Sequence, residues 1–428
     1  MPILGIDLGT TKSAAVLYTP GAAPVSCSRE NQAGYGTQSV EKILNSAIAA
    51  VRGLPEDLRK KVTEIGVTGQ MHGVLAWSGT EHSGLENWQS PLAQTSGTLK
   101  RITRIPGCEN LASGFGFATL AVSGWRRQYR HAATIMDYFA ALLTRRKTPA
   151  TDPTNAASWG LWNIRRGDWN RNAIRALEIP EEILPQIVPS GSCLGPLCRE
   201  WSERLGIPAD IPVRVPLGDN PAALLGSGGV PETDLFLTVG TGAQLAFIPN
   251  GKEAESCGAL ELRPFPGGRL LAVSASLCGG KAMEVLADFI GDVLNSFSVS
   301  VPRGEIYRKL SEEVPEGISP LTVSTHFTGE RNNPALRGGI AGIGMDNLRF
   351  HPLCRAWCEG ILNALLNGFP QTVLTERRRL VVNGNAIRKS PLFRQVIRER
   401  FPDLENILPE NCEEAACGAA IYCADYGL

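Results

Sequence analysis

The sequence predicts an α/β protein made of two similar domains, each built around a mixed sheet. Its 428 residues exceed the length of about 250–300 residues at which a single hydrophobic core stops growing, so we expect two domains. A strand–turn–strand pattern near the start of the chain recurs near its middle. Elsewhere, apolar runs typical of strands alternate with segments of helical spacing, which favours the α/β class.

The repeated pattern occupies residues 3–18 (ILGIDLGTTKSAAVLY) and residues 235–248 (LFLTVGTGAQLAFI). Each segment is an apolar run, a turn that contains Gly-Thr, and a second apolar run. Because glycine tolerates the backbone angles of a tight turn, each segment predicts a β-hairpin. The recurrence about half a chain later indicates that the two domains are alike.

The remaining elements follow from the spacing of apolar residues. In residues 282–294 they recur every three or four positions, which predicts an amphipathic helix. The strand expected at 212–216 leads into a Gly-Asp-Asn-Pro turn, and we place the domain boundary there, giving domains 1–217 and 218–428. Further helices are expected over 40–51, 132–143, 355–366 and from 391, and further strands over 62–67 and 380–382.

Composition and charge exclude several function classes. The 42 Lys and Arg residues equal the 42 Asp and Glu residues, so the chain has no overall attraction for nucleic acid or for an anionic membrane surface. No apolar stretch reaches the roughly 18 residues of a membrane span, and the apolar start lacks a signal peptide's basic lead. The eleven cysteines show no paired metal-ligand spacing, and their odd number predicts reduced thiols and a cytoplasmic location.

The Gly-Thr turns are candidate phosphate sites. Backbone N–H groups and hydroxyls in such a turn can hold an anion without a fixed cation. Asp7 precedes the first turn, where a carboxylate could hold Mg²⁺ directly or through water; the alternative is an aspartate that caps the turn. A further glycine turn at Gly384, between a strand and a helix, would let a nucleotide approach the backbone.

Asp219 is the candidate catalytic base. It follows an apolar strand within the turn at 218–221, and phosphoryl transfer to an alcohol needs a group that accepts the hydroxyl proton. A turn-stabilising aspartate is an equally good interpretation of the spacing alone. His72, in a glycine-flanked loop, could bind a sugar hydroxyl or be a packed loop histidine.

Several motifs together resemble the FGGY family of carbohydrate kinases. They are GIDLGTT at 5–11, TGQMHG at 68–73, LGDN at 217–220, TVGTGAQL at 238–245 and EAACGAA at 414–420. The resemblance implies two ribonuclease-H-like domains, as in actin, hexokinase and the heat-shock chaperone ATPases, with a cleft between them. It also implies an ATP- and Mg²⁺-dependent kinase of a small-molecule sugar, monomeric or homodimeric.

The resemblance assigns roles residue by residue. It makes Asp219 the base and Asp7 the residue that serves Mg²⁺. The sugar contacts that it implies are Gln70, Met71, His72, Trp88, Asp219 and Asn220. The ATP contacts that it implies are Thr10, Thr11, Lys12, Gly240, Thr241, Gly242, Gly280, Glu284, Gly384 and Asn385.

Within the family, stretches such as SGFGFATLA at 113–121 and TNAASWGLWN at 154–163 resemble the sedoheptulokinases. This implies that sedoheptulose is converted to sedoheptulose 7-phosphate; kinases of xylulose, ribulose or another ketose or polyol, or a non-catalytic sugar sensor, are the alternatives. The family usually has an Asp and an Arg shortly after the tryptophan at position 88, whereas this chain has Gln89-Ser90-Pro91. We therefore expect altered sugar contacts in this loop.

Overall fold

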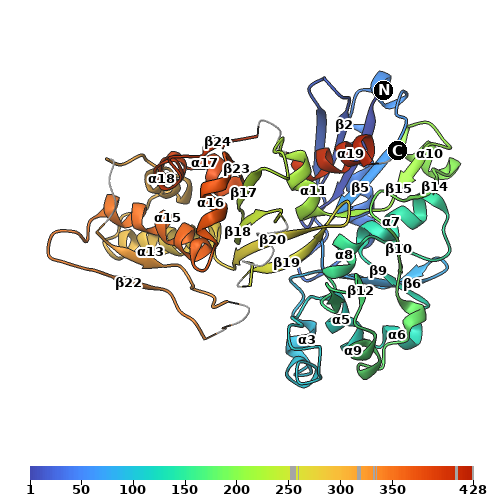
Figure 1. Ribbon diagram of the computed structural model, residues 1–428, viewed down its shortest axis with the longest axis horizontal. Helices are drawn as coiled ribbons and strands as arrows, with labels where there is room; N and C mark the ends of the chain where they lie inside the picture. The colour runs from blue at the N-terminus through green and yellow to red at the C-terminus, as the bar shows by residue number, and fades with distance from the viewer. Residues whose placement is uncertain are drawn as a thin grey trace. The chain divides into compact units, whose positions relative to one another are not determined.

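The computed structural model describes residues 1–250, 257–258, 260–315, 320–330, 333, 335–409 and 413–426 (Figure 1). The chain forms two compact units. The first comprises Met1–Gly228, Arg263–Arg269 and Asn411–Leu428, and the second comprises Gly229–Leu262 and Leu270–Glu410. The units thus divide after Gly228 rather than at 217/218, and two later segments return to the first unit.

The sheet of the first unit has the strand order β14-β15-β5-β1-β2-β3, with β16 also paired to β5. β2 is antiparallel to both β1 and β3, whereas β5 pairs in parallel with β1, β15 and β16. The edge strand β14 is antiparallel to β15. The strands are β1 (Ile3–Leu8), β2 (Lys12–Tyr18), β3 (Val25–Glu30), β5 (Ile65–Gly69), β14 (Cys193–Pro196), β15 (Pro212–Arg214) and β16 (Leu217–Gly218).

The six-stranded sheet β19-β20-β18-β17-β23-β24 repeats this plan, and its strands lie in the second unit except for residues 263–265 of β19 and Arg269 of β20. The antiparallel β20-β18-β17 correspond to β3-β2-β1, and the parallel β23 and β24 correspond to β5 and β15. Both predicted hairpins and the duplicated α/β fold are therefore confirmed. The strands are β17 (Asp234–Val239), β18 (Ala243–Phe247), β19 (Glu261–Phe265), β20 (Arg269–Ser276), β23 (Arg379–Asn383) and β24 (Glu405–Ile407).

The predicted helices are present, with two clearly changed starts: the helix expected from residue 355 begins at Phe350, and the helix expected from residue 132 begins at Ile135. Residues 132–133 belong to a strand, and the helix begins after Thr134, whose hydroxyl accepts from the Asp137 N–H at 3.3 Å and caps it. The larger helices are α1 (Val40–Arg52), α7 (Ile135–Thr144), α10 (Arg199–Leu205), α11 (Asp219–Gly226), α13 (Gly280–Ser296), α14 (Arg303–Leu310), α15 (Phe350–Leu366), α18 (Pro391–Arg400) and α19 (Glu414–Tyr426).

Shorter elements connect these layers. In the first unit they are β4 (Thr37–Gln38), α2 (Glu56–Arg59), β6 (Leu75–Ser78), β7 (Glu81–His82), β8 (Leu85–Glu86), α3 (Leu92–Thr95), α4 (Leu99–Ile102), α5 (Gly116–Val122), α6 (Trp125–Gln128), β9 (His131–Ala133), β10 (Ala150–Thr151), α8 (Pro153–Ala157), β11 (Trp162–Asn163), β12 (Asp168–Trp169), α9 (Arg171–Ala176), the 3₁₀ helix η1 (Glu181–Ile183) and β13 (Gln186–Ile187). In the second they are β21 (Thr322–Ser324), β22 (Gly339–Ala341), α16 (Gln371–Glu376) and α17 (Asn385–Lys389).

Helix α19 lies against β1, β5 and α11 at backbone distance, and Figure 1 shows it beside them. Glycines make this approach possible. A Cβ on Gly5 would lie 1.8 Å from the carbonyl oxygen of Ala416, and one on Gly418 would lie 1.7 Å from that of Ala222. The end of the chain thereby supports α11, which begins with Asp219.

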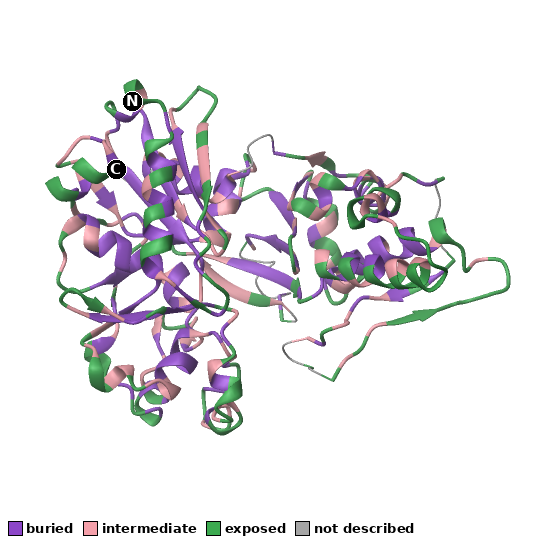
Figure 2. Ribbon diagram, turned by 180° about the vertical axis from the view of Figure 1, so that it is seen from behind, coloured by how far each residue is buried: buried purple, intermediate pink, exposed green. Residues whose placement is uncertain are grey.

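The sheets carry the buried core of each unit, and their strands are largely purple in Figure 2. A further apolar cluster in the first unit surrounds the fully buried Trp159, with Phe117 and Trp169 packed edge-on or tilted against it. Trp159 is thus a core residue. No helix in the described ranges combines the length and the apolar character that crossing a membrane requires.

Candidate functional site

The first Gly-Thr turn, residues 9–11, joins β1 to β2, and its carbonyl oxygens accept hydrogen bonds from residues outside the turn. Asn31 Nδ2 donates to the carbonyl of Gly9 at 3.0 Å, and Gln38 Nε2 donates to that of Thr10 at 2.8 Å. The N–H of Asn31 donates to the carbonyl of Thr11 at 2.9 Å. These contacts hold the turn in one conformation. Backbone N–H groups and hydroxyls in a turn of this kind can bind a phosphate oxygen.

Asp7 lies at the end of β1 beside this turn. Its Oδ1 is buried and has no hydrogen-bond partner within the described ranges. Burial, followed by the negative charges of Asp219 and Glu413, raises the pKa of Asp7 to about 7, while Lys12 opposes the shift. A divalent cation would bind this unpartnered carboxylate oxygen and offset the negative charges of the neighbouring carboxylates.

The protein alone does not form a closed metal site here. Within the described ranges, no three His, Cys, Asp or Glu side chains are grouped so as to hold a metal ion. Mg²⁺ often takes only one or two carboxylates and completes its shell with phosphate oxygens and water. Asp7 fits that pattern as a single ligand, directly or through water.

Asp219 is the first residue of α11 and directly follows the two-residue strand β16. Burial raises the pKa of Asp219 to about 6, although backbone hydrogen bonds at Asn220 and the charge of Arg263 act in the opposite direction. The carboxyl group is therefore ionised at neutral pH and binds a proton more strongly than an ordinary aspartate. This is a suitable state for a general base.

His72 lies after β5 in a left-handed backbone conformation, with φ of 72°. Its N–H donates to Ser158 Oγ at 2.9 Å, and its Nδ1 lies 2.8 Å from the carbonyl oxygen of Ser158. Because a carbonyl can only accept, Nδ1 carries a proton in this contact. The ring also stacks on Phe115 at 4.6 Å.

Gln70 and Trp88 meet at Thr10. The indole N–H of Trp88 donates to Thr10 Oγ1 at 3.0 Å, and that hydroxyl donates to Gln70 Oε1 at 3.3 Å. Gln70 is 2% exposed and its Nε2 donates to Gln38, so it lies beneath the turn. Trp88 is 42% exposed, as a ligand-contacting aromatic would be.

The loop that lacks the family's Asp and Arg is held by a buried glutamate instead. Glu86 is 7% exposed and accepts from the hydroxyls of Thr37, at 2.7 Å, and Ser90. Sequence reasoning missed Glu86. Met71, next to His72, packs on Gly218, since a Cβ on that glycine would lie 2.8 Å from Met71 Sδ. Substituting Gly218 would therefore displace Met71.

In the second unit, the turn at 240–242 joins β17 to β18 and meets the start of α13. The N–H of Gly280 donates to the carbonyl of Gly240 at 2.6 Å, and that of Gly279 donates to Thr241 at 2.9 Å. The parallel pairing of Thr238 with Asn383 brings Gly384 to the same sheet edge. A Cβ on Gly384, whose φ is 102°, would lie 2.2 Å from the Val239 carbonyl oxygen.

Three segments that were predicted to bind the nucleotide therefore lie in the second unit: the turn at 240–242, the start of α13 and the turn at Gly384. Four of their residues are exposed, namely Gly240, Thr241, Glu284 and Asn385. The predicted residues Thr10, Thr11, Lys12 and all predicted sugar residues belong to the first unit. Sequence reasoning missed Glu330, which accepts from Ser276 Oγ at 2.6 Å and from the N–H of Leu277 at 3.2 Å. Glu330 thereby fixes the loop before α13.

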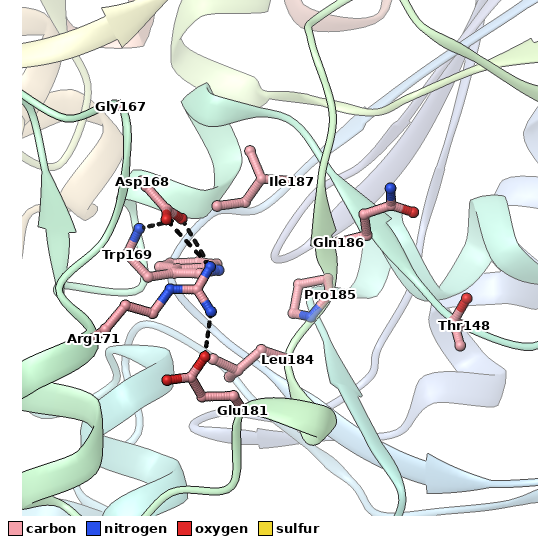
Figure 3. A pocket seen from close by; sticks show the side chains of 10 residues that line it. All are labelled: Thr148, Gly167, Asp168, Trp169, Arg171, Glu181, Leu184, Pro185, Gln186 and Ile187. Carbon is pink, nitrogen blue, oxygen red and sulfur yellow. Dashed lines mark hydrogen bonds and ion pairs between the residues drawn. The ribbon is translucent and has the colours of Figure 1, made fainter.

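A separate pocket of about 590 Å³ lies in the first unit and includes none of the predicted site residues (Figure 3). Arg171 Nη2 and Asp168 Oδ1 are 3.1 Å apart on its wall, and Arg171 also pairs with Glu181 at 2.5 Å. The guanidinium is thus already neutralised by two carboxylates, which leaves the wall without excess positive charge for an anionic ligand.

Comparisons with known proteins show which families this chain resembles. Residues 121–226 match the FGGY family of carbohydrate kinases, N-terminal domain. A sedoheptulokinase of Homo sapiens is 29% identical over 98% of this chain and 96% of its own length. The sedoheptulokinase of Mus musculus is 28% identical over 93% of this chain and 92% of its own.

Solved structures show the same fold. The xylulose kinase from Rhodospirillum rubrum has a TM-score of 0.80 at 18% identity, covering 100% of this chain and 91% of its own. The gluconate kinase from Lactobacillus acidophilus has a TM-score of 0.77 at 20% identity, covering 100% of this chain and 89% of its own. The likeness thus extends over both units.

Proposed function

We propose that the chain is a carbohydrate kinase of the FGGY family that phosphorylates a ketose, with sedoheptulose giving sedoheptulose 7-phosphate as the leading reaction. The observation that carries the proposal is the proximity of Asp219 to Asp7. Leu8 of β1 and Gly218 of β16 are both paired with Gly69 of β5, so a candidate base and a candidate metal ligand lie at the same sheet edge beside the turn at 9–11. The charge of Asp219 also raises the pKa of Asp7. The likeness to sedoheptulokinases supports the choice of sugar.

In the proposed reaction, Asp219 accepts the proton of a primary sugar hydroxyl. The hydroxyl oxygen forms a bond to the γ-phosphorus of ATP as the bond from that phosphorus to the ADP oxygen breaks. His72 and Trp88 bind the sugar, and the turns at 9–11 and 240–242 bind phosphates. Mg²⁺, with Asp7 as its protein ligand, would neutralise charge on the phosphate oxygens.

The remaining predicted contacts belong to the same proposal. Met71 and Asn220 flank the sugar, while Gln70 supports Thr10 from below. In the first unit Lys12 is a proposed phosphate contact, and in the second unit Gly280, Glu284, Gly384 and Asn385 are the proposed nucleotide contacts. A cytoplasmic location is supported by the ten described cysteines, which are all free thiols.

The test is an ADP-release assay with ATP and Mg²⁺ across sedoheptulose, xylulose, ribulose, fructose, glycerol and a blank without sugar. We expect the highest kcat/KM with sedoheptulose. A higher kcat/KM for another ketose would change the proposed substrate but would leave the proposed kinase activity in place. ATP and sugar binding without sugar-dependent ADP release would contradict the kinase and favour a sensor.

A further inference from the structure

One short helix and the residue after it contact both the strand that precedes the candidate base and the histidine loop. Helix α8 (Pro153–Ala157) carries Thr154 in its first turn and is followed directly by Ser158. The Thr154 hydroxyl accepts from the N–H of Gly218 at 3.0 Å, and Gly218 immediately precedes Asp219. The Ser158 hydroxyl accepts from the N–H of His72 at 2.9 Å. Both hydrogen bonds are made to backbone N–H groups, so they restrain the backbone positions of Gly218 and His72.

The Leu217–Gly218 peptide, which lies one peptide before Asp219, is held on both sides by threonine hydroxyls. Thr68 Oγ1 donates to the Leu217 carbonyl at 2.9 Å, while the N–H of Gly218 in the same peptide donates to Thr154. Strand β16 has only two residues, so its pairing with β5 gives little restraint by itself. These two side chains therefore fix the plane of the Leu217–Gly218 peptide, and with it the position of Gly218, the residue to which Asp219 is joined.

Asp152 fixes the direction of the Thr154 hydroxyl. Thr154 donates its proton to Asp152 Oδ1 at 2.7 Å, which turns its lone pairs toward Gly218. Asp152 is 0% exposed, caps α8 through the N–H of Asn155 at 2.9 Å, and accepts from Ser190 at 2.6 Å. A hydroxyl that donates to a carboxyl oxygen is polarised and becomes a better acceptor.

The helix itself is anchored in the core. Asn155 is 0% exposed, and its Nδ2 donates to Asp137 Oδ2 at 2.7 Å and to Thr134 Oγ1 at 2.9 Å. Thr154 and Ser158 are four residues apart, which corresponds to about 6 Å along a helix axis. Helix α8 thus holds the two contact points at a fixed separation.

We propose that Thr154 and Ser158 are positioning residues that set the placement of Asp219 and His72 relative to each other. This inference rests on the proposed function, because it assumes that Asp219 is the base and that His72 binds the sugar. Thr154 is then expected to influence kcat, since it acts on the base. Ser158 is expected to influence KM for the sugar, since it acts on the histidine.

The test compares kcat and KM of Thr154→Val, Thr154→Ser and Ser158→Ala with wild type. Valine keeps the shape of threonine but removes the acceptor, so we expect kcat to fall by about 10- to 100-fold, as for a small misplacement of a catalytic group. We expect serine at position 154 to restore most of kcat. Ser158→Ala should raise KM for the sugar by about tenfold, the loss of one hydrogen bond.

Ser190→Ala is the matched control. It removes a hydrogen bond from the same Asp152 without touching the Leu217–Gly218 peptide. We expect it to lower the melting temperature without changing kcat. The inference would be overturned if Thr154→Val lowered kcat no more than Ser190→Ala, or if serine gave no recovery. A wild-type protein without sugar-dependent turnover would instead overturn the proposed function, and this inference with it.

Discussion

Lys12 donates to both carboxylate oxygens of Glu413, with Nζ–O distances of 2.7 and 2.8 Å. A lysine expected from the sequence to contact ATP is thus bound to a carboxylate at the start of α19. The Lys12 side chain is 42% exposed, so this pair is weakened by solvent screening. A phosphate group arriving at the turn would compete with Glu413 for the ammonium group.

Substituting Lys12 and substituting Glu413 should shift the pH dependence of activity in opposite directions. Glu413 raises the pKa of Asp7 and Lys12 lowers it. If Asp7 must be ionised to serve Mg²⁺, activity falls as pH drops through its pKa of about 7. Glu413→Gln should move this acidic limb to lower pH, and Lys12→Met should move it to higher pH. The measurement is kcat/KM for MgATP between pH 5 and 9; shifts in the same direction would contradict the assignment.

Asp219→Asn should lower kcat by at least about a hundredfold, the low end for loss of a general base. Asparagine keeps the size of the side chain but cannot accept the hydroxyl proton as a carboxylate does. Sugar affinity, measured by titration calorimetry, should stay near that of wild type. Turnover close to wild type in this variant would eliminate Asp219 as the base.

The positions of the Gly-Thr turns were predictable because the sequence patterns that indicate them are local. A Gly-Thr turn between two apolar runs, as at residues 9–11, predicts a hairpin without reference to the rest of the chain. The supports of these turns come from distant positions. Asn31, Glu86 and Glu330 hold the site loops, but each is an ordinary polar residue in sequence and gains its role only through tertiary contacts.

Domain assignment from sequence is limited in the same way, because it too depends on contacts between distant positions. Residues 414–426 follow the second-domain motifs in sequence, yet α19 packs on the sheet of the first unit. Only the backbone approach at Gly5 and Gly418 reveals this arrangement, and a glycine in sequence does not indicate which backbone will lie against it.

Trp88 should report binding at the first phosphate turn. Its indole donates to Thr10, so a phosphate that reorients the Thr10 hydroxyl changes the surroundings of the indole. We expect MgATP to alter the tryptophan emission of wild type, and Trp88→Phe to lose most of that change. Trp125→Phe, which removes a partly buried indole at the apolar cluster around Trp159, is the control. An undiminished response in Trp88→Phe would exclude this coupling.

Asp137 should make the protein less stable as pH rises. Burial raises the pKa of Asp137 to about 8. From about pH 4 upward the unfolded chain releases this proton while the folded protein retains it, so the free energy of unfolding declines until pH passes about 8. Asparagine cannot ionise, and its carbonyl can accept from Thr134 and Asn155 as Asp137 does. The decline should therefore be shallower in Asp137→Asn.

Urea unfolding at unit intervals from pH 5 to 9 measures this difference. Asp57→Asn, at an exposed position in α2, serves as the control for loss of one carboxylate. Parallel pH dependences for wild type and Asp137→Asn would show that Asp137 ionises in the folded protein at its ordinary pKa.

Gly418→Ala should destabilise the first unit and reduce activity together. The added methyl group would lie 1.7 Å from the carbonyl oxygen of Ala222 in α11, and backbone on both sides leaves no side chain to move aside. Overpacking of this kind costs about 1–3 kcal/mol or more. Because α11 begins with Asp219, the shift that relieves the clash also displaces the base.

The control is Gly304→Ala in α14, where a Cβ would meet nothing within 4 Å. Alanine is favoured over glycine within a helix by about 0.5–1 kcal/mol, so this variant should be at least as stable as wild type. The measurement is the urea midpoint together with kcat. An unchanged midpoint for Gly418→Ala would contradict the close approach of α11 and α19, and with it the support that α19 gives to Asp219.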